Sequence, residues 1–164
     1  MSALTSARSW VWGASARSWV WGARLAAVIL ALLPLPAAAL DYLSLAEAAV
    51  MYDAPSQKSA PLFVIARHTP VEVVVALEGW YKVRDAGGGI AWVEKRQLSP
   101  KRTLQVTAPS AQVRAKADAS GALVFEAERD VVLDLVETAE AGWVKVRHRD
   151  GQSGYVRANQ VWGL

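Results

Sequence analysis

Two segments with the same pattern decide the fold: Gly-Trp-Tyr-Lys-Val-Arg-Asp at residues 79–85 and Gly-Trp-Val-Lys-Val-Arg-His at residues 142–148. In each, large apolar side chains alternate with Lys and Arg at a period near two, which is typical of a β-strand with one face on a core and one in water. The second segment begins 63 positions after the first, and Gly-Tyr-Val at residues 154–156 follows Ala-Trp-Val at residues 91–93 at the same offset. The sequence therefore predicts a small β unit that occurs twice.

Short strands and tight turns account for the rest of the first copy. A β-branched strand at residues 71–75 leads into the segment at 79–85, and three glycines at 87–89 supply the turn to a returning strand at 90–93. A single 3₁₀ turn is expected at residues 94–98. The second copy repeats this plan, and neither copy contains a long amphipathic helix. About five short strands in about sixty residues predict a small β-barrel, so the expected fold class is all-β with two small barrels in tandem.

Three parts of the chain can be separated by composition and repeat. The length of 164 residues suits two small domains. Ser99-Pro100 marks the junction between the copies, so we place the first domain at residues 40–99 and the second at residues 100–164. Residues 40–49 fit either a brief helical turn or an extended lead-in to the first domain. Residues 1–39 form a separate N-terminal segment.

That N-terminal segment has the composition of a secretory signal peptide. Arg17 and Arg24 precede an apolar run that ends at Pro34, and Ala37-Ala38-Ala39 places small residues where a signal peptidase reads. The apolar run is about half of the roughly 20 residues needed to span a bilayer. We therefore expect cleavage after Ala39, no stable membrane anchor in the mature protein, and a periplasmic or secreted location.

A Trp-rich duplication precedes the apolar run: Ala-Arg-Ser-Trp-Val-Trp-Gly-Ala occurs at residues 7–14 and again at residues 16–23. It could be an aromatic segment that seeks a membrane interface. We favour a short duplication, or an over-extended start upstream of an ordinary signal sequence, with no place in the fold.

The charge balance argues against nucleic-acid binding. The chain has 18 basic and 15 acidic residues, a formal net charge of +3. Three arginines within residues 1–39 account for the excess, so the remaining residues have a net charge of zero. Binding to phosphates requires a net or clustered positive surface. The absence of cysteine also excludes disulfides, thiol catalysis and thiolate metal sites.

No constellation of residues predicts catalysis or metal binding. His68 and His148 each lie where a strand meets a turn and have no ligand-spaced partner, so we interpret both as exposed structural histidines. Acidic residues are scattered singly, without the spacing of an acid–base pair or a Ca²⁺ loop. The glycines at 87–89 lack the following helix and the Lys-Ser/Thr of a P-loop. We expect no catalytic residue, no metal and no cofactor.

The pattern Gly-Trp-x-Lys-Val-Arg, followed by a Gly turn, a small residue with an aromatic and Val, and a closing turn, resembles the bacterial SH3-like (SH3b) domain. The resemblance covers nearly all of residues 45–164 as two copies. It implies export, ligand binding, often to peptidoglycan or to an envelope protein partner, and no catalysis by the module itself. Two positions depart from the repeat. Ala91 stands where the second copy and the usual family pattern have Gly, and Arg114 stands where the first copy has Tyr52.

Aromatic side chains are the one functional signal. Within an SH3-like barrel, the outer ends of the opening strand and hairpin strands converge on a shallow groove, and aromatic rings suit it because they give large contact area at low entropy cost. The candidate ligand-binding residues are Tyr52, Tyr81, Trp92 and Tyr155. Core packing is the alternative: we favour it for Trp80 and Trp143 and leave it open for the three aromatic residues of the first copy. The first copy has three aromatic residues at these positions, whereas the second copy has Arg114, Val144 and Tyr155 there. We therefore expect the ligand to bind to the first barrel.

These observations predict an exported, non-catalytic binding or scaffold protein of the bacterial cell envelope. Its partner would be peptidoglycan, through cell-wall peptide, or an extended segment of an envelope protein. The alternative is a structural accessory subunit of an envelope complex that binds no small ligand. An envelope enzyme is disfavoured by the lack of suitable residues.

Overall fold

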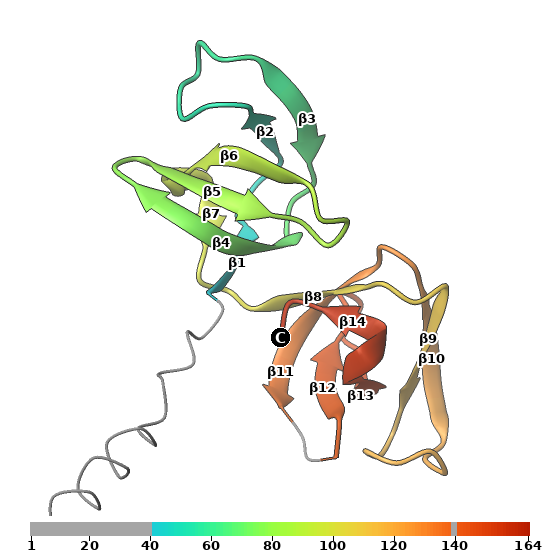
Figure 1. The fold of residues 1–164 in the computed structure, drawn as a ribbon. Helices are drawn as coiled ribbons and strands as arrows, with labels where there is room; N and C mark the ends of the chain where they lie inside the picture. The colour runs from blue at the N-terminus through green and yellow to red at the C-terminus, as the bar shows by residue number, and fades with distance from the viewer. Residues whose placement is uncertain (1–40, 139–140) are drawn as a thin grey trace, which may run out of the picture. The chain divides into compact units, whose positions relative to one another are not determined.

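The computed structural model describes residues 41–138 and 141–164, which fold into two β-sheets of seven strands each (Figure 1). The predicted signal peptide and its duplicated segment lie outside the described residues. Within the described ranges the elements are strands and short 3₁₀ helices, so the predicted all-β fold class is confirmed. No helix in these ranges is long and apolar enough to cross a membrane.

The first sheet has the strand order β3-β2-β6-β5-β4-β1-β7, with every neighbouring pair antiparallel. The lead-in to this sheet is extended rather than helical, because it forms the first strand. The strands are β1 (Tyr42–Leu45), β2 (Ala49–Tyr52), β3 (Pro61–Ile65), β4 (Pro70–Leu77), β5 (Trp80–Arg84), β6 (Ile90–Glu94) and β7 (Leu98–Ser99). The expected 3₁₀ turn is present as η2 (Lys95–Gln97).

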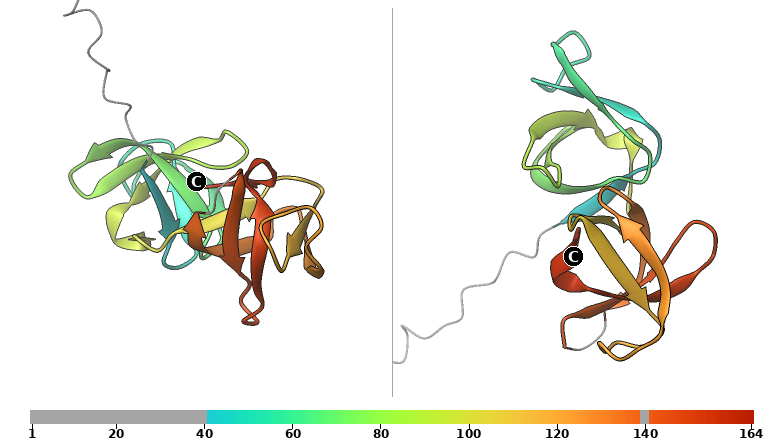
Figure 2. Two further views of the ribbon diagram at one scale, coloured as in Figure 1. Left: turned by 90° about the horizontal axis from the view of Figure 1, so that it is seen from below. Right: turned by 90° about the vertical axis from the view of Figure 1, so that its right-hand side faces the viewer.

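The second sheet repeats this topology in the order β10-β9-β13-β12-β11-β8-β14. Each strand occupies the same position in the sheet as its counterpart in the first sheet, so the prediction of a small β unit that occurs twice is confirmed. The strands are β8 (Thr103–Val106), β9 (Ser110–Arg114), β10 (Leu123–Glu128), β11 (Val132–Thr138), β12 (Trp143–Arg147), β13 (Ser153–Arg157) and β14 (Val161–Trp162), with η3 (Ala158–Gln160) before the last. Each sheet curls around its own core (Figure 2).

The two cores consist of the inward residues of alternating strands. In β5 and β6, Val83 and Val93 are fully buried, whereas Lys82 and Trp92 on the intervening positions remain partly exposed. The period of two read from the sequence is therefore the alternation between core and solvent. The first core comprises Leu45, Ala49, Met51, Ile65, Val71, Val83, Ala91 and Val93. The second comprises Leu104, Val106, Ala111, Val113, Ala127, Leu133, Val144, Val146, Val156 and Val161.

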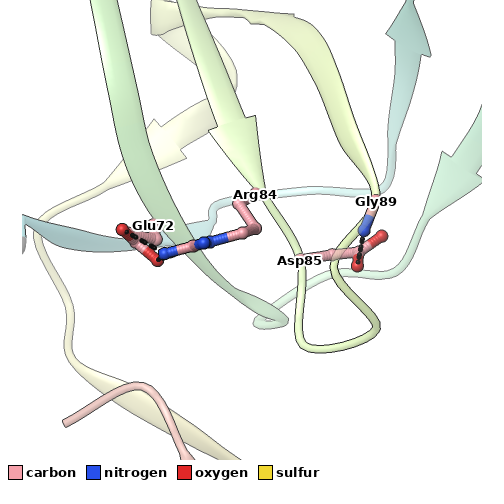
Figure 3. Close-up of polar contacts among 4 residues, drawn as sticks. All are labelled: Glu72, Arg84, Asp85 and Gly89. Atoms are coloured by element: carbon pink, nitrogen blue, oxygen red, sulfur yellow. Dashed lines mark hydrogen bonds and ion pairs between the residues drawn. The ribbon is translucent and has the colours of Figure 1, made fainter.

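The turn between β5 and β6 is fixed by a carboxylate at its base. Oδ1 of Asp85 accepts a hydrogen bond from the backbone N–H of Gly89 at 2.8 Å (Figure 3). It accepts a second from the backbone N–H of Gly87 at 2.9 Å. Gly88 has a φ of +86°, a left-handed conformation that glycine adopts without a steric penalty. The predicted glycine turn is present, and Asp85 stabilises it by satisfying donors that a tight turn leaves without strand partners.

An ion pair joins β4 and β5 in the first sheet. Glu72 is only 5% exposed, and its carboxylate accepts hydrogen bonds from the Arg84 guanidinium at 2.9 Å to Nε and 2.6 and 2.8 Å to one terminal nitrogen (Figure 3). The corresponding cross-strand pair in the second sheet is Asp134 with Arg147. There the shorter carboxylate pairs instead with Lys101, at 2.7 Å.

The departure at Ala91 has a local packing reason. At the matching site in the second sheet, a Cβ on Gly154 would lie 2.6 Å from the backbone oxygen of Arg114 and 2.8 Å from a methyl group of Val113. Strand β9 therefore crosses β13 too closely for a side chain. The first sheet holds the Ala91 methyl group in its core at 1% exposure.

Candidate functional site

The outward positions of β2, β5 and β6 form an aromatic surface on the first barrel, here called the first face and defined by Tyr52, Trp80, Lys82, Trp92 and Glu94. Tyr52 lies directly opposite Trp92 across β2 and β6, and Trp80 lies opposite Glu94 across β5 and β6. The Tyr52 and Trp80 rings contact edge to face, with centroids 5.7 Å apart and an interplanar angle of 84°. All five side chains are half-buried, so the rings are held in place by neighbours and remain open to solvent.

Two opposite charges flank these rings. Nζ of Lys82 lies 5.8 Å from the centre of the Trp92 ring. The Glu94 carboxylate accepts hydrogen bonds of 2.6 Å from Nε of Arg96 and 2.6 Å from Nε2 of Gln57. The bond from Arg96, and next the bond from Gln57, lower the pKa of the Glu94 carboxyl below its ordinary value. Glu94 therefore remains negatively charged beside Trp80 at neutral and mildly acidic pH.

The predicted binding residues do not form a single site. Tyr52 and Trp92 are brought together on the first face. Tyr81 lies on the opposite side of β5, where its ring packs against the first core and Nζ of Lys95 lies 4.7 Å from the ring centre. Of the two readings left open for Tyr81, the structure supports core packing. Tyr155 belongs to the second barrel.

The prediction that Trp80 packs in the core is wrong. Trp80 lies on the first face and contacts Tyr52. The alternation of residues along β5 indicates this outward position. Trp80 has the same parity as Lys82, whose ammonium group must reach water, and the opposite parity to Val83, which is fully buried.

The second barrel carries a surface at the same place, here called the second face and defined by Arg114, Trp143, Lys145, Tyr155 and Arg157. Tyr155 lies opposite Arg114, and Trp143 lies opposite Arg157, as Trp92 and Trp80 lie opposite Tyr52 and Glu94 in the first barrel. The Arg157 guanidinium carbon lies 4.6 Å from the centre of the Trp143 ring. Trp143 is 5% exposed. It is therefore buried as expected, but beneath side chains of the outer face and not in the cluster inside the barrel.

The two histidines lie in turns and are half-buried, so their interpretation as exposed residues is corrected. His68 has a φ of +67° in the turn before β4. Nδ1 of His148 lies 3.0 Å from a carboxylate oxygen of Asp150. No group of three His, Cys, Asp or Glu residues suited to a metal ion occurs in the part of the chain that the structure describes.

Comparison with known families gives two matches along this chain. A family model described as the bacterial SH3 domain matches residues 46–100 and again residues 107–163. The chain belongs to the bacterial SH3 domain family. The resemblance inferred from the repeated strand-turn-strand pattern is thereby confirmed, as are its two tandem copies. Bacterial SH3 domains are commonly binding modules associated with the cell wall or envelope, and they are typically extracellular or periplasmic.

Solved structures similar to this bacterial SH3 protein come from larger proteins. NlpC2 from Trichomonas vaginalis is 12% identical, with 76% of this chain and 48% of that chain covered at a TM-score of 0.35. NlpC1 from the same organism is 13% identical, with coverages of 78% and 47% and a TM-score of 0.36. An NlpC/P60 family protein from Bacillus cereus is 16% identical, with coverages of 74% and 55% and a TM-score of 0.35. The chain thus spans about half the length of these proteins. No curated protein sequence matches it.

Proposed function

We propose that this protein is an exported, non-catalytic binding module of the bacterial cell envelope, and that the first face holds its ligand. The observation that carries the proposal is the group of Tyr52, Trp80 and Trp92, three half-buried rings on adjacent strands of a bacterial SH3 domain. The ligand class that suits it is an extended peptide, either in peptidoglycan or in an envelope protein.

The physical properties of the first face support a peptide ligand. Aromatic rings provide large, rigid contact area, and Trp and Tyr are the side chains that most often dominate binding energy at interfaces. Lys82 and Glu94 flank the rings with opposite charges. A peptide offers apolar side chains for the rings and polar groups of both kinds for the charges.

The role as a structural accessory is favoured by a different observation. Strand β3 stands at the edge of the first sheet and carries three exposed apolar side chains and no charged one: Leu62, Phe63 and Val64, with Val64 67% exposed. Exposed edge strands usually carry charges that prevent pairing with other chains. An edge without them suits a protein that adds a strand to a neighbouring subunit.

Sedimentation with purified sacculi tests the proposed function. We expect the protein to co-sediment, and we expect Trp92→Ala to weaken binding by about 2 kcal/mol, some thirtyfold, with little change in melting temperature. Ile90→Ala is the matched control, because Ile90 is an exposed residue on the same strand, at the end far from Glu94. Equal binding by the wild type, Trp92→Ala and Tyr52→Ala would exclude the first face as the binding surface.

The non-catalytic part of the proposal needs its own measurement. Sacculi incubated with the protein should release no soluble fragments beyond those released in buffer. Fragment release by the wild type would assign the protein to the enzymes. Absence of co-sedimentation together with capture of one envelope protein, lost on Val64→Lys, would support the accessory role.

A further inference from the structure

The second face differs from the first in the charges that line it. The register of the strands sets Arg114 in the place of Tyr52 and Arg157 in the place of Glu94. It also sets Glu126, opposite Gln112, in the place of Val64, opposite Val50. The first face thus carries one positive and one negative side chain, Lys82 and Glu94. The second face carries three positive ones, Arg114, Lys145 and Arg157, with Glu126 beside them.

The two arginines line one open pocket of about 470 Å³, together with Trp143, Gln112 and Glu126. Arg114 is held in place by hydrogen bonds from its terminal nitrogens to the backbone oxygen of Gly121, at 2.7 Å, and to Oε1 of Gln112. Both of these acceptors are neutral. The Arg157 guanidinium lies over the Trp143 ring.

The pocket has an excess of positive charge. Neither guanidinium forms an ion pair with an acidic side chain within residues 41–138 and 141–164. Among the described residues of the lining, Glu126 supplies the one carboxylate, which accepts a 3.0 Å hydrogen bond from Nε2 of Gln112. Two arginines against one glutamate give the described residues of the lining one net positive charge, which complements one negative charge in a ligand.

A carboxylate fits this lining better than other anions. The planar fork of a guanidinium matches the two oxygens of a carboxylate, and its hydrogen bonds to ionised acceptors are about twice as strong as neutral ones. A dianionic phosphate would meet repulsion from Glu126. The volume also admits the adjoining residue or two of an extended chain.

We propose that the second barrel binds the carboxylate of an extended peptide between Arg114 and Arg157. This inference rests on the proposed function for the class of ligand, and it adds a division of labour. The first face binds apolar and aromatic parts of a peptide through stacking, and the second face binds its negatively charged end. The two copies then recognise different features of one kind of ligand.

Titration of the ¹⁵N-labelled protein, followed by NMR, tests this inference with acetyl-alanyl-alanine as the probe. The probe with a free carboxylate should shift the Nε resonances of Arg114 and Arg157 and the indole resonance of Trp143. The carboxamide form of the same peptide should bind at least tenfold more weakly. Inorganic phosphate serves as the competing anion and should also bind more weakly.

Variants distinguish binding by the arginines of the pocket from attraction by the overall positive charge of the surface. Arg157→Gln should weaken binding of the carboxylate probe at least tenfold. If Arg157→Gln melts at a lower temperature than the wild type, Arg157→Lys takes its place in the titration, because it retains the positive charge. Arg147→Gln removes an exposed arginine of β12 outside the pocket and should leave the affinity unchanged.

Each outcome decides between the claims. No shift at the solubility limit of the probe, equal shifts with the carboxamide, or tighter binding of phosphate would overturn the carboxylate site. If the wild type fails to bind sacculi while the carboxylate probe shifts Arg157, the envelope function fails and the carboxylate site stands. If sacculi are bound and Trp92→Ala abolishes that binding while the probe produces no shifts, the reverse holds.

Discussion

The first and second barrels share strand order, strand register and an apolar core, and their charges differ most on one outer face. Tyr52 packs edge to face against Trp80 beside the negative charge of Glu94. In the second barrel Arg114 and Arg157 take the places of Tyr52 and Glu94, and Trp143 is covered. Within this chain the repeated features are those that the barrel needs to fold. Most features that vary lie on the outer face to which we assign ligand binding.

The largest expected difference between the barrels concerns their matching tryptophans. Trp143→Ala should destabilise the protein by roughly 3 kcal/mol or more, the cost of removing a buried aromatic side chain. Trp80→Ala should cost clearly less, because Trp80 is only partly buried. Urea unfolding of both variants measures this, with Ile90→Ala as a control for an exposed apolar residue. Equal losses would mean that the two outer faces are packed alike.

Glu72 and Asp134 occupy matching positions in β4 and β11, and their ion pairs should differ less in stability than the two tryptophans do. Arg84→Ala leaves the buried Glu72 carboxylate without its cation and should therefore destabilise the protein more than the loss of an exposed ion pair does. Lys101→Ala removes the partner of the exposed Asp134 and should cost less than about 1 kcal/mol. The free energies of unfolding in low and high salt measure both. A larger loss from Lys101→Ala would reverse this assignment.

A reciprocal exchange tests the close strand crossing in the second barrel. Gly154→Ala should destabilise the protein by about 1.5 kcal/mol, since the added Cβ would lie 2.6 Å from the Arg114 backbone oxygen and β9 must move. Ala91→Gly should cost about 0.5–1 kcal/mol through backbone entropy, and more through the loss of a methyl group that is buried in the first core. The same displacement of β9 should weaken the binding of the carboxylate probe, because Arg114 lies on that strand. Unchanged melting of Gly154→Ala would show that the two strands can separate freely.

The smallest expected effect concerns pH and Glu94. The folded-state pKa of this carboxyl is lowered by its hydrogen bonds to Arg96 and Gln57. The stability that these bonds add is therefore fully present at any pH above the ordinary pKa of a glutamate. It is lost as the pH falls through the lowered folded-state pKa. Melting temperatures of the wild type and Glu94→Gln should therefore differ by the same small amount at pH 7 and pH 5. The difference should disappear on further acidification. A difference that disappears between pH 7 and pH 5 would contradict the lowered pKa.

The sequence predicts features that neighbouring residues determine, and it does not predict features that depend on the pairing of distant strands. Periodicity and turn chemistry located the strands around residues 79–85 and 142–148, and the 3₁₀ turn at η2, because neighbouring residues determine them. The partner of Trp143 could not be found this way, since Arg157 reaches it only through strand pairing. The Glu72–Arg84 pair also depends on register, and the pairing of β4 with β5 shifts between Val73 and Val75. Such an irregularity leaves no periodic signal.

The Asp85 carboxylate that closes the β5–β6 turn also bears on the order in which the chain folds. Its hydrogen bonds to Gly87 and Gly89 span four residues or fewer, so they can form before distant strands meet. In the second barrel, Asp150 Oδ1 accepts a comparable bond from the backbone N–H of Gln152 at 2.9 Å. Hairpins form in about 1–10 μs, far ahead of the long-range pairing that limits barrel folding. We therefore expect this hairpin to form early in the folding of each barrel. Asp85→Ala should slow refolding of the first barrel more than it speeds unfolding in stopped-flow measurements.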